Sequence, residues 1–508
     1  MAGDAERVIV IGAGHNGLVA AFYLAKAGYA PLVLERAAIA GGSAITEEIH
    51  PGIRCPVLFD ISGPLLPEIE RDMQLAKQGV ETISSEVQTV ALNPDGSAIR
   101  IYTDPARTAS ELERISAHDG RKFSEFHSTF QRLGRAIAPL LRMTPPDTDT
   151  PTAQDLLNLG KLGLKFQGIG EKDAHRLLRW GPMPVADLSS EWFENDLLRA
   201  TIESRGIFGM FAGPRSAGTT VGLLLQAALG TPAQIRGGLG ALTQAMTKAA
   251  SAAGAQIRTG SEVERIIVDR GKVRGIVLKG GEEIAARAVV SNADPHQTLL
   301  KLIGPAELAP GLLMKVRSYR AMGALAKVNL ALSAIPAFSS IAPRIHIGPD
   351  TDYLERAYDA AKYGDFSREP VLQVGIPSVG DAHVLSIFVQ YAPYRLKTGN
   401  WDSRREELGD VVVKTLSSYA PGIEKLILAR QILTPLDIER RFGMSGGHIF
   451  HGEQSLDQLF TFRPLLGLAR YRTPIKGLYL CGSGTHPGVG ITGASGWNAS
   501  REILKDLK

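Results

Sequence analysis

The pattern of hydrophobic and polar positions predicts a β-α-β unit near the N-terminus. Arg7–Ile11 is a short β-branched run, Leu18–Gly28 has a helical pattern, and Pro31–Leu34 is a second apolar run. Short continuous apolar runs of this kind are typical of buried parallel strands. We therefore expect the opening of the chain to contribute two neighbouring strands and a connecting helix to a parallel sheet.

A helical pattern follows, which we interpret as a mainly helical insertion over residues 103–230. Five apolar residues spaced by three and four positions mark one helix face, and they are Phe123, Phe126, Phe130, Leu133 and Ile137. The simplest interpretation of this stripe is a helix that faces the core. The stretch Met143–Thr152 is rich in Pro and Asp, which predicts a surface loop.

The pattern changes again downstream, and we interpret residues 231–300 as the second part of the domain that residues 1–102 begin. Glycines lead into an Ala-rich helical pattern that ends near Gly254. Short strand patterns then follow at 256–259, 263–268, 273–278 and 288–291. Residues 301–465 contain longer strand-like stretches, "GALAKVNLALS" and "HVLSIFVQYAPY", and a helical stretch. These features predict a separate mixed sheet that serves as a substrate-binding domain.

Residues 466–508 return to the opening pattern. Gly477–Cys481 is a short apolar strand, a glycine-rich loop follows, and a helix is expected from about Ala494 to the end. The domain that the first residues begin is therefore expected to be discontinuous in sequence. A length of 508 residues supports two or three structural domains, because it exceeds what one simple core accommodates.

Composition narrows the classes of protein that remain. Hydrophobic residues make up 44% and charged residues 21%, as is ordinary for a globular protein. The net charge is 56 − 52 = +4 without a basic run, so we expect no nucleic-acid partner. The two cysteines, Cys55 and Cys481, form no C-x-x-C, which argues against a redox dithiol or a zinc knuckle.

The chain carries no recognisable leader and no stretch near the roughly 20 apolar residues that cross a bilayer. The longest apolar candidate, Val221–Gly230, is about half that length. We therefore expect a cytoplasmic protein, for which peripheral contact with a membrane surface stays open.

A glycine fingerprint connects the first predicted strand to the first helix. Gly12, Gly14 and Gly17 form G-x-G-x-x-G, in which the glycines permit a tight turn, close approach to a pyrophosphate, and close helix packing. The helix start offers free N–H groups to phosphates. Glu35 closes the second strand, where a carboxylate can accept ribose hydroxyls. Strand, helix, strand and acid together indicate dinucleotide binding by Gly12, Ala13, Gly14, His15, Asn16, Gly17 and Glu35.

A second glycine pair, Gly41–Gly42, follows the acid at short distance. In this respect the chain resembles flavoproteins of the glutathione-reductase superclass. The resemblance implies an α/β fold (α+β overall) with a Rossmann-like FAD-binding domain, interrupted by the mixed-sheet domain and the helical insertion. It also implies FAD as cofactor and further contacts from Arg36, Gly41, Gly42, Ser43 and Val263.

The C-terminal block contains glycines at Gly482, Gly484, Gly488, Gly490 and Gly493. Glycines at this density let backbone amides approach a ligand, and a flavin ring needs donors near N1 and O2. With "GGHIFHGEQSLDQLF" and "FRP" upstream, the block resembles bacterial-type phytoene desaturases and carotenoid isomerases, and most of all the branch named for pyridine nucleotide-disulphide oxidoreductase domain-containing protein 2. The resemblance assigns FAD contacts to Gly482, Ser483, Gly490, Ile491 and Gly493.

The segment "GGHIFHGEQSLDQLF" holds His448, His451 and Glu453, for which three interpretations are open. A metal site is disfavoured, because the glycines break any helix that would place both imidazoles on one face. The segment can be a structural loop, with its histidines bonded to backbone and Glu453 in an internal ion pair, for instance with Arg463. By analogy with the family, it can also form a wall of the flavin pocket, where a histidine accepts a proton as hydride leaves.

These features predict an FAD-dependent oxidoreductase. Its substrate is expected to be an apolar or amphipathic small molecule that loses hydride at C–H or C–N, with oxygen, a quinone or another molecule as electron acceptor. Three alternatives are an amine oxidase with an aromatic cage near Tyr471 and Trp497, an isomerase that uses reduced flavin, and a binding or chaperone protein of the Rab escort type. Asp60 is a weaker candidate for the pocket, and His486 and Cys481 are interpreted as structural. The oligomeric state stays open.

Overall fold

The nucleotide-binding part of the protein is built on a five-stranded parallel sheet. The computed structural model describes residues 7–60, 63–147, 151–380 and 382–508. The strand order in this sheet is β19-β13-β1-β2-β9, and each neighbouring pair is parallel. Its strands are β1 (Val8–Ile11), β2 (Leu32–Leu34), β9 (Gln256–Arg258), β13 (Ala288–Ser291) and β19 (Leu478–Leu480). The predicted β-α-β opening is confirmed, and segments from both ends of the chain meet in one sheet.

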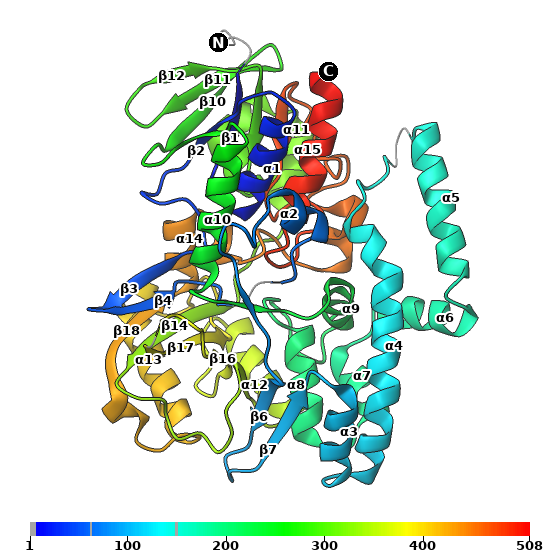
Figure 1. Ribbon diagram of the computed structural model, residues 1–508, viewed down its shortest axis with the longest axis vertical. Coiled ribbons are helices and arrows are strands. Elements are labelled where there is room, and N and C mark those ends of the chain that lie inside the picture. Colours follow the sequence, from blue (N-terminus) through cyan, green and yellow to red (C-terminus); the bar gives the residue numbers. More distant parts are fainter. Residues whose placement is uncertain (1–6, 61–62, 148–150, 381) are drawn as a thin grey trace.

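Alternate residues of β1 face opposite layers, because side chains alternate across a strand. Val8 and Val10 pack in the same core cluster as helices α1 (His15–Lys26), α10 (Leu239–Ala252) and α15 (Ala494–Leu507). Ile9 and Ile11 pack instead against an antiparallel three-stranded sheet. That sheet consists of β10 (Val263–Asp269), β11 (Lys272–Leu278) and β12 (Glu283–Ala285). The parallel sheet is therefore covered on both faces, and this part of the molecule lies at the top of Figure 1.

A seven-stranded mixed sheet forms the other large part, at the lower left of Figure 1. Its order is β18-β14-β17-β16-β15-β6-β7. The residues of β14 that pack against helix α13 (Trp401–Ser417) alternate with residues that face the interior of the molecule, where Lys327 and Asn329 lie. The strands are β6 (Val87–Leu92), β7 (Ala98–Tyr102), β14 (Leu325–Leu332), β15 (Arg344–Ile347), β16 (Val371–Gly375), β17 (His383–Gln390) and β18 (Ile427–Leu433).

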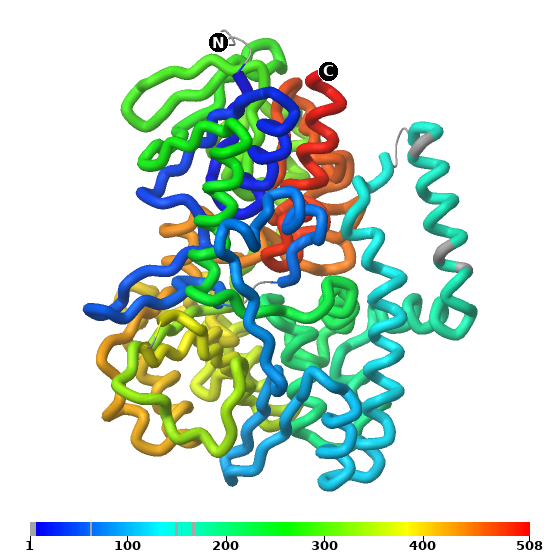
Figure 2. The backbone as a smooth tube through the Cα atoms, in the orientation of Figure 1, coloured from blue at the N-terminus to red at the C-terminus, as the bar shows by residue number. Residues whose placement is uncertain are grey.

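Two strands of the predicted first segment, residues 1–102, lie in this mixed sheet and not in the nucleotide-binding part. β6 pairs in parallel with β15, and β7 pairs with β6 at the sheet edge. Figure 2 shows the blue chain passing from the upper part to the foot of the molecule before it forms these strands. A boundary at residue 102 is therefore too late, because a strand pattern does not specify which sheet the strand joins.

The helical block packs as predicted around its aromatic stripe. Phe126 and Phe130 of α4 (Ala117–Leu141) lie in one core cluster with Trp180 and Trp192. The Phe130 and Trp180 rings stack with centroids 5.4 Å apart. Helix α5 (Ala153–Gln167) stands apart at the right edge of Figure 1. The block contains α3 (Pro105–Glu113), α4 (Ala117–Leu141), α5 (Ala153–Gln167), α6 (Glu171–Trp180), α7 (Val185–Trp192), α8 (Asp196–Gly206) and α9 (Thr220–Leu229). Of the predicted surface loop at 143–152, residues 148–150 lie outside the described residues.

The remaining elements are short and connect the main layers. They are β3 (Thr46–His50), β4 (Ile53–Pro56), α2 (Pro67–Asp72), β5 (Thr82–Ile83), β8 (Gln234–Ile235), a π-helix (Gln297–Ile303), α11 (Pro310–Ser318), α12 (Thr351–Lys362) and α14 (Pro435–Phe442). Within the described ranges, the helices are all too short or too polar to cross a bilayer.

Candidate active site

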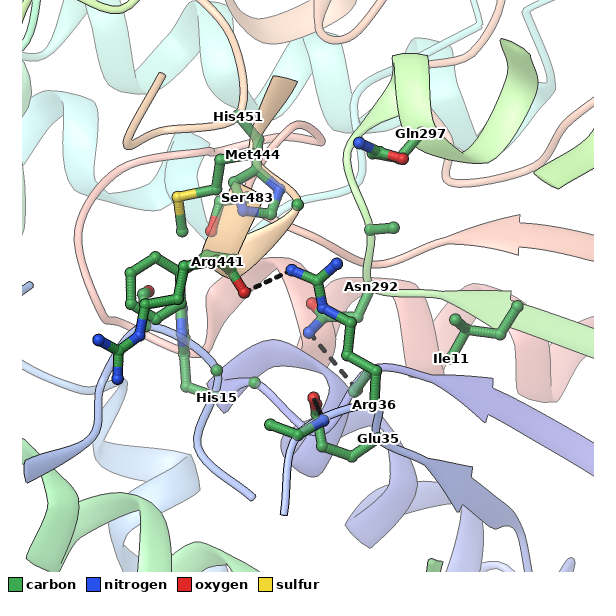
Figure 3. Close-up of a pocket in the computed structure, with 18 of the residues that line it drawn as sticks. Ile11, His15, Glu35, Arg36, Asn292, Gln297, Arg441, Met444, His451 and Ser483 are labelled. Carbon is green, nitrogen blue, oxygen red and sulfur yellow. Dashed lines mark hydrogen bonds between the residues drawn. The ribbon is translucent and has the colours of Figure 1, made fainter. Parts of the chain in front are cut away.

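A large cavity opens at the carboxyl ends of β1, β2 and β13, where ligands bind in parallel α/β sheets. Its volume is about 720 Å³, and loops from the first and last parts of the chain meet across it (Figure 3). Many residues that the sequence assigned to FAD line this cavity. They are Gly12, Gly14, His15, Glu35, Arg36, Gly42, Ser43, Val263, Ser483, Gly490 and Ile491.

The other assigned residues support the cavity from behind its wall. Ala13 donates its N–H to Glu35 Oε2 (2.8 Å) and accepts the Gly41 N–H (2.9 Å), so the two glycine turns are joined. The Asn16 side chain donates to Ser483 Oγ (3.2 Å), which links the first helix to the last loop. Gly17, Gly482 and Gly493 likewise do not line the cavity.

At two of the fingerprint glycines, different neighbours leave no room for a side chain. A Cβ atom at Gly17 would lie 2.1 Å from the Gly12 carbonyl oxygen, so the helix packs against the strand only with glycine there. A Cβ atom at Gly14 would lie 2.8 Å from Asn292 Nδ2 at the cavity wall. The turn thus keeps its backbone close to the cavity, as a pyrophosphate requires.

The carboxylate of Glu35, at the end of β2, is held in place by two backbone N–H groups. It is buried, and its two carboxylate oxygens accept the N–H groups of Ala13 (2.8 Å) and Ala37 (2.9 Å). Each ionised carboxylate oxygen has further acceptor capacity. The side chain can therefore accept both hydroxyls of an adenosine ribose while its own position is fixed by backbone amides.

Two half-buried histidines that line this cavity each have a buried ring nitrogen without a partner among the described residues. Within the part of the chain that the structure describes, His15 Nε2 and His451 Nδ1 form no hydrogen bond, and both residues line the cavity. Buried polar atoms without partners are uncommon in native proteins. Their presence, with the backbone cradle and Glu35, fits a large polar cofactor such as FAD in this cavity.

The protonation of these histidines follows from burial. Desolvation, and then the nearby His451, lower the pKa of His15 to about 3. Desolvation also lowers the pKa of His451, with Asp294 acting in the opposite direction and Arg463 in the same one. Both rings are therefore neutral near pH 7 and can donate or accept one hydrogen bond.

The structure separates the three residues proposed for catalysis. His451 lines the cavity, whereas His448 lies behind it, with its Nδ1 accepting the Phe450 N–H (3.2 Å). Desolvation, followed by Arg463 and His451, lowers the pKa of His448 to about 3. Glu453 does not line the cavity and pairs with Arg320 (2.8 Å). The three do not gather as a metal-ligand group among the described residues.

Arg463, the suggested ion-pair partner of Glu453, has a different role. Its guanidinium is fully buried and donates to the carbonyls of Phe450 (2.8 Å), Glu453 (2.9 Å) and Ser483 (2.8 Å). The expected ion pair of Glu453 is present, but its partner is Arg320. Arg463 instead fastens the histidine loop to the C-terminal glycine loop, so both walls of the cavity depend on it.

Several cavity residues were not identified from the sequence. Asn292 and Gln297 line the cavity at the end of β13, in a stretch whose residue types indicate only a turn. Nearby Asp294 accepts the N–H and the hydroxyl of Ser445, at 2.7 and 3.0 Å. The sequence did contain a clue to Asn292 and Gln297, because residues just after a parallel strand of such a sheet line the ligand crevice. Arg441 and Met444 reach the cavity from α14 and the loop that follows it, which only the fold brings there.

A second, smaller cavity of about 160 Å³ adjoins the first. Phe59, Phe450, Gly490 and Ile491 line both cavities. The inner cavity lies between the mixed sheet on one side and helices α8 and α9 on the other, and Asp60 is part of its lining. A ligand in it would therefore lie beside the C-terminal glycine loop.

The other residues singled out from the sequence do not line either cavity. Tyr471 is fully buried and donates its hydroxyl to the His486 carbonyl (2.9 Å), while Trp497 packs under Arg501. The His486 ring bonds to the Leu140 carbonyl (2.8 Å), and Cys481 is buried at the end of its strand, as expected for structural residues.

Comparison with known proteins identifies the family. The profile of the family described as flavin containing amine oxidoreductase matches residues 17–504. The chain is 35% identical to pyridine nucleotide-disulfide oxidoreductase domain-containing protein 2 of Rattus norvegicus, over 98% of this chain and 93% of that protein. It is 26% identical to a neurosporene-forming phytoene desaturase of Rhodobacter capsulatus, over 96% of this chain and 92% of that protein.

Solved structures show the same fold at low sequence identity. An oxidoreductase from Methanosarcina mazei superposes with a TM-score of 0.63 at 17% identity, covering 98% of this chain and 100% of that one. A cofactor-binding variant of putrescine oxidase gives 0.62 at 16% identity, with 99% of both chains covered. The chain therefore belongs to the flavin containing amine oxidoreductase family and is an FAD-dependent oxidoreductase, which confirms the predicted fold, cofactor and enzyme class.

Proposed function

We propose that the protein is a dehydrogenase that removes hydride from an amphipathic small molecule bound in the inner cavity. The observation that carries this proposal is the shared lining of the two cavities by Phe59, Phe450, Gly490 and Ile491. A substrate in the inner cavity would meet the cofactor across these residues. Flavin, when bound, supplies a two-electron acceptor for the hydride at N5.

The residues of the chain would orient the substrate and exclude water. Phe208, Phe388 and Phe450 form aromatic walls around the inner cavity, which favour an apolar body. Gln454 donates to the Gly488 carbonyl (3.1 Å), which fixes the glycine loop at the junction. His451 is our candidate to take a proton, since the residue lines the cofactor cavity and its buried Nδ1 has no partner within the described chain.

A second candidate function is amine oxidation, which removes hydride from the carbon of a C–N bond. The matched family profile and the fold shared with putrescine oxidase support it. The predicted aromatic cage of Tyr471 and Trp497 does not support it, because neither residue lines a cavity. The aromatic residues that do line the inner cavity are phenylalanines, Phe59, Phe208, Phe388 and Phe450.

The test is anaerobic reduction of the bound flavin by a panel of small amphipathic alcohols, acids, alkenes and amines. Reduction is monitored as the loss of flavin absorbance. We expect at least one non-amine compound to bleach the flavin. Bleaching by amines alone would replace the proposal with the second candidate. Phe450→Ala should then slow bleaching by about 10-fold or more without loss of bound FAD, because it removes a wall shared by both cavities.

Phe462→Ala is the matched control, since Phe462 lies just after the segment that holds Phe450, lines neither cavity and is 45% exposed. It should bleach at the wild-type rate. An unchanged rate in Phe450→Ala would remove the inner cavity from the reaction path.

A further inference from the structure

The inner cavity contains two guanidinium groups that are not neutralised by protein carboxylates. Arg205 of α8 and Arg344 of β15 line it from opposite sides, with Arg344 on the face of the mixed sheet. Within the described residues, neither guanidinium has a carboxylate within salt-bridge distance. The exposed Arg205 side chain donates its Nε–H to the neutral Gln226 Oε1 (3.0 Å), and its terminal nitrogens form no hydrogen bond within the described residues.

The single lining carboxylate in the described part of this cavity does not cancel these charges. Asp60 lies 3.9 Å from the buried ammonium of Lys327, which is also 3.7 Å from the centroid of the Phe388 ring. Lys327 and Asp60 together are neutral when both are charged. The two arginines therefore leave the cavity with a net positive charge of about two.

The arginines also affect each other, as expected for two nearby cations. Desolvation, and then Arg344, lower the pKa of Arg205 to about 10. Desolvation lowers the pKa of Arg344, while Asp60 raises it. Both remain charged at pH 7, and a compact anion between them would relieve their repulsion.

The rest of the lining fits an anion that is attached to an apolar body. Polar neutral groups come from Ser204, Gln226 and Gln373, close in the chain or in the sheet to the two arginines. Apolar side chains lie toward the cofactor cavity and along α9, and they include Phe450, Leu225, Leu229, Val489 and Ile491. A cationic amine would meet two unpaired guanidinium groups at this end.

From this arrangement we propose that the substrate carries a carboxylate, which Arg205 and Arg344 bind at the solvent-exposed end of the inner cavity while the apolar part extends toward the flavin. The proposal deepens the proposed function, since it names the substrate class of the same cavity. Arginine suits this role because its planar fork binds a carboxylate through two parallel hydrogen bonds.

Binding, rather than turnover, tests this proposal. The FAD-containing protein is titrated by calorimetry with three probes of similar shape, namely phenylacetate, its neutral amide phenylacetamide, and the amine phenethylamine. We expect phenylacetate to bind at least about 10-fold more tightly than the amide, and the amine to bind most weakly, as charge-assisted hydrogen bonds imply. Equal binding of acid and amide, or preference for the amine, would overturn the proposal.

Arginine variants connect this preference to the residues. Arg205→Gln and Arg344→Gln should each weaken phenylacetate binding about 10-fold and leave phenylacetamide unchanged, and Arg344→Lys should lose less. Arg265→Gln, at an exposed position of β10 outside both cavities, should bind all three probes as the wild type does. Retention of the acid preference in both glutamine variants would also overturn the proposal. If no compound reduces the flavin but the acid preference is found, the proposed function fails and the carboxylate site stands.

Discussion

At the scale of single residues, the histidine loop illustrates how burial selects among equivalent side chains. His448 and His451 lie three positions apart, and within the described residues each has one buried ring nitrogen without a partner, yet only His451 lines the cavity, while His448 Nδ1 accepts the Phe450 N–H behind it. His451 has a positive φ (59°), so the chain turns at this residue. The residue's place in the turn, not its type, decides which imidazole can meet the cofactor or substrate.

The first prediction follows from this difference. His451→Gln should slow anaerobic flavin reduction by at least about 10-fold, because general bases typically contribute ~10²–10⁴-fold. Glu453→Gln should reduce the flavin at the wild-type rate, since that carboxylate pairs with Arg320 outside the cavity. Stopped-flow absorbance with the best substrate of the panel measures both rates. If His451→Gln is as fast as the wild type, the ring serves cofactor binding or structure alone.

A second prediction concerns the acid at the end of β2. Glu35→Gln should weaken FAD binding by about 10-fold or more, because the amide NH₂ cannot accept the backbone N–H that one carboxylate oxygen accepts now. The dissociation constant is measured by quenching of flavin fluorescence on addition of the apoprotein. Glu282→Gln, on the surface in a pair with Arg258, should retain wild-type affinity. Equal affinities would mean that Glu35 supports the turn without contacting the cofactor.

At the scale of elements, the helical insertion is stabilised by stacked aromatic residues. Phe130 stacks on Trp180 at an interplanar angle of 11°, and Phe126 packs edge-to-face on Trp192. Phe130→Ala should lower the free energy of unfolding by about 3–5 kcal/mol, because it leaves a cavity in a buried cluster. Urea unfolding measures this loss. Leu164→Ala, at a position of α5 that is 69% exposed, should change the value by less than about 0.5 kcal/mol.

Elements whose determinants are local could be predicted from the sequence. The β1-α1-β2 unit and the helix face of Phe126 and Phe130 were predicted correctly, because spacing within a few residues specifies them. The partners of strands could not be predicted in the same way. Strand β6 pairs with β15, about 250 positions later in the chain, and its own apolar pattern is compatible with either sheet.

The residues of the candidate site also fall into two groups, those specified by nearby sequence and those brought together only by the tertiary structure. Glu35 and the fingerprint glycines lie close in sequence to the strand that positions them, so motif reasoning found them. Arg205 and Arg344 come from a helix and a strand that are 139 residues apart, and each is an ordinary residue in its own segment. Only the packing of α8 over the mixed sheet brings them into one cavity. The charge of the inner cavity is therefore a property of the tertiary structure.

At the scale of the whole molecule, buried histidines couple folding to pH. Desolvation lowers the pKa of His15 and His448 to about 3, and that of His346 and His486 to about 4. In the unfolded chain a histidine takes up its proton near pH 6.5. Below that pH the unfolded state binds more protons than the native state, so the free energy of unfolding must fall as the pH falls.

The last prediction concerns how much the free energy of unfolding falls with pH and which residues cause the fall. Each such histidine should remove about 2 kcal/mol of stability between pH 6.5 and pH 5, at about 1.4 kcal/mol per pH unit. Urea unfolding of the FAD-containing protein at pH 7 and pH 5 measures the loss. His346→Gln should lose less stability over this interval by about 2 kcal/mol, because it removes one group that is protonated only in the unfolded state. His346 suits the test, since its ring bonds to the Gly348 carbonyl (2.9 Å) in the mixed sheet and lines neither cavity. Thr398→Ala changes an exposed residue that does not titrate, so it should keep the wild-type dependence of stability on pH. If His346→Gln also kept the wild-type dependence, His346 would not be a neutral buried ring in the native state.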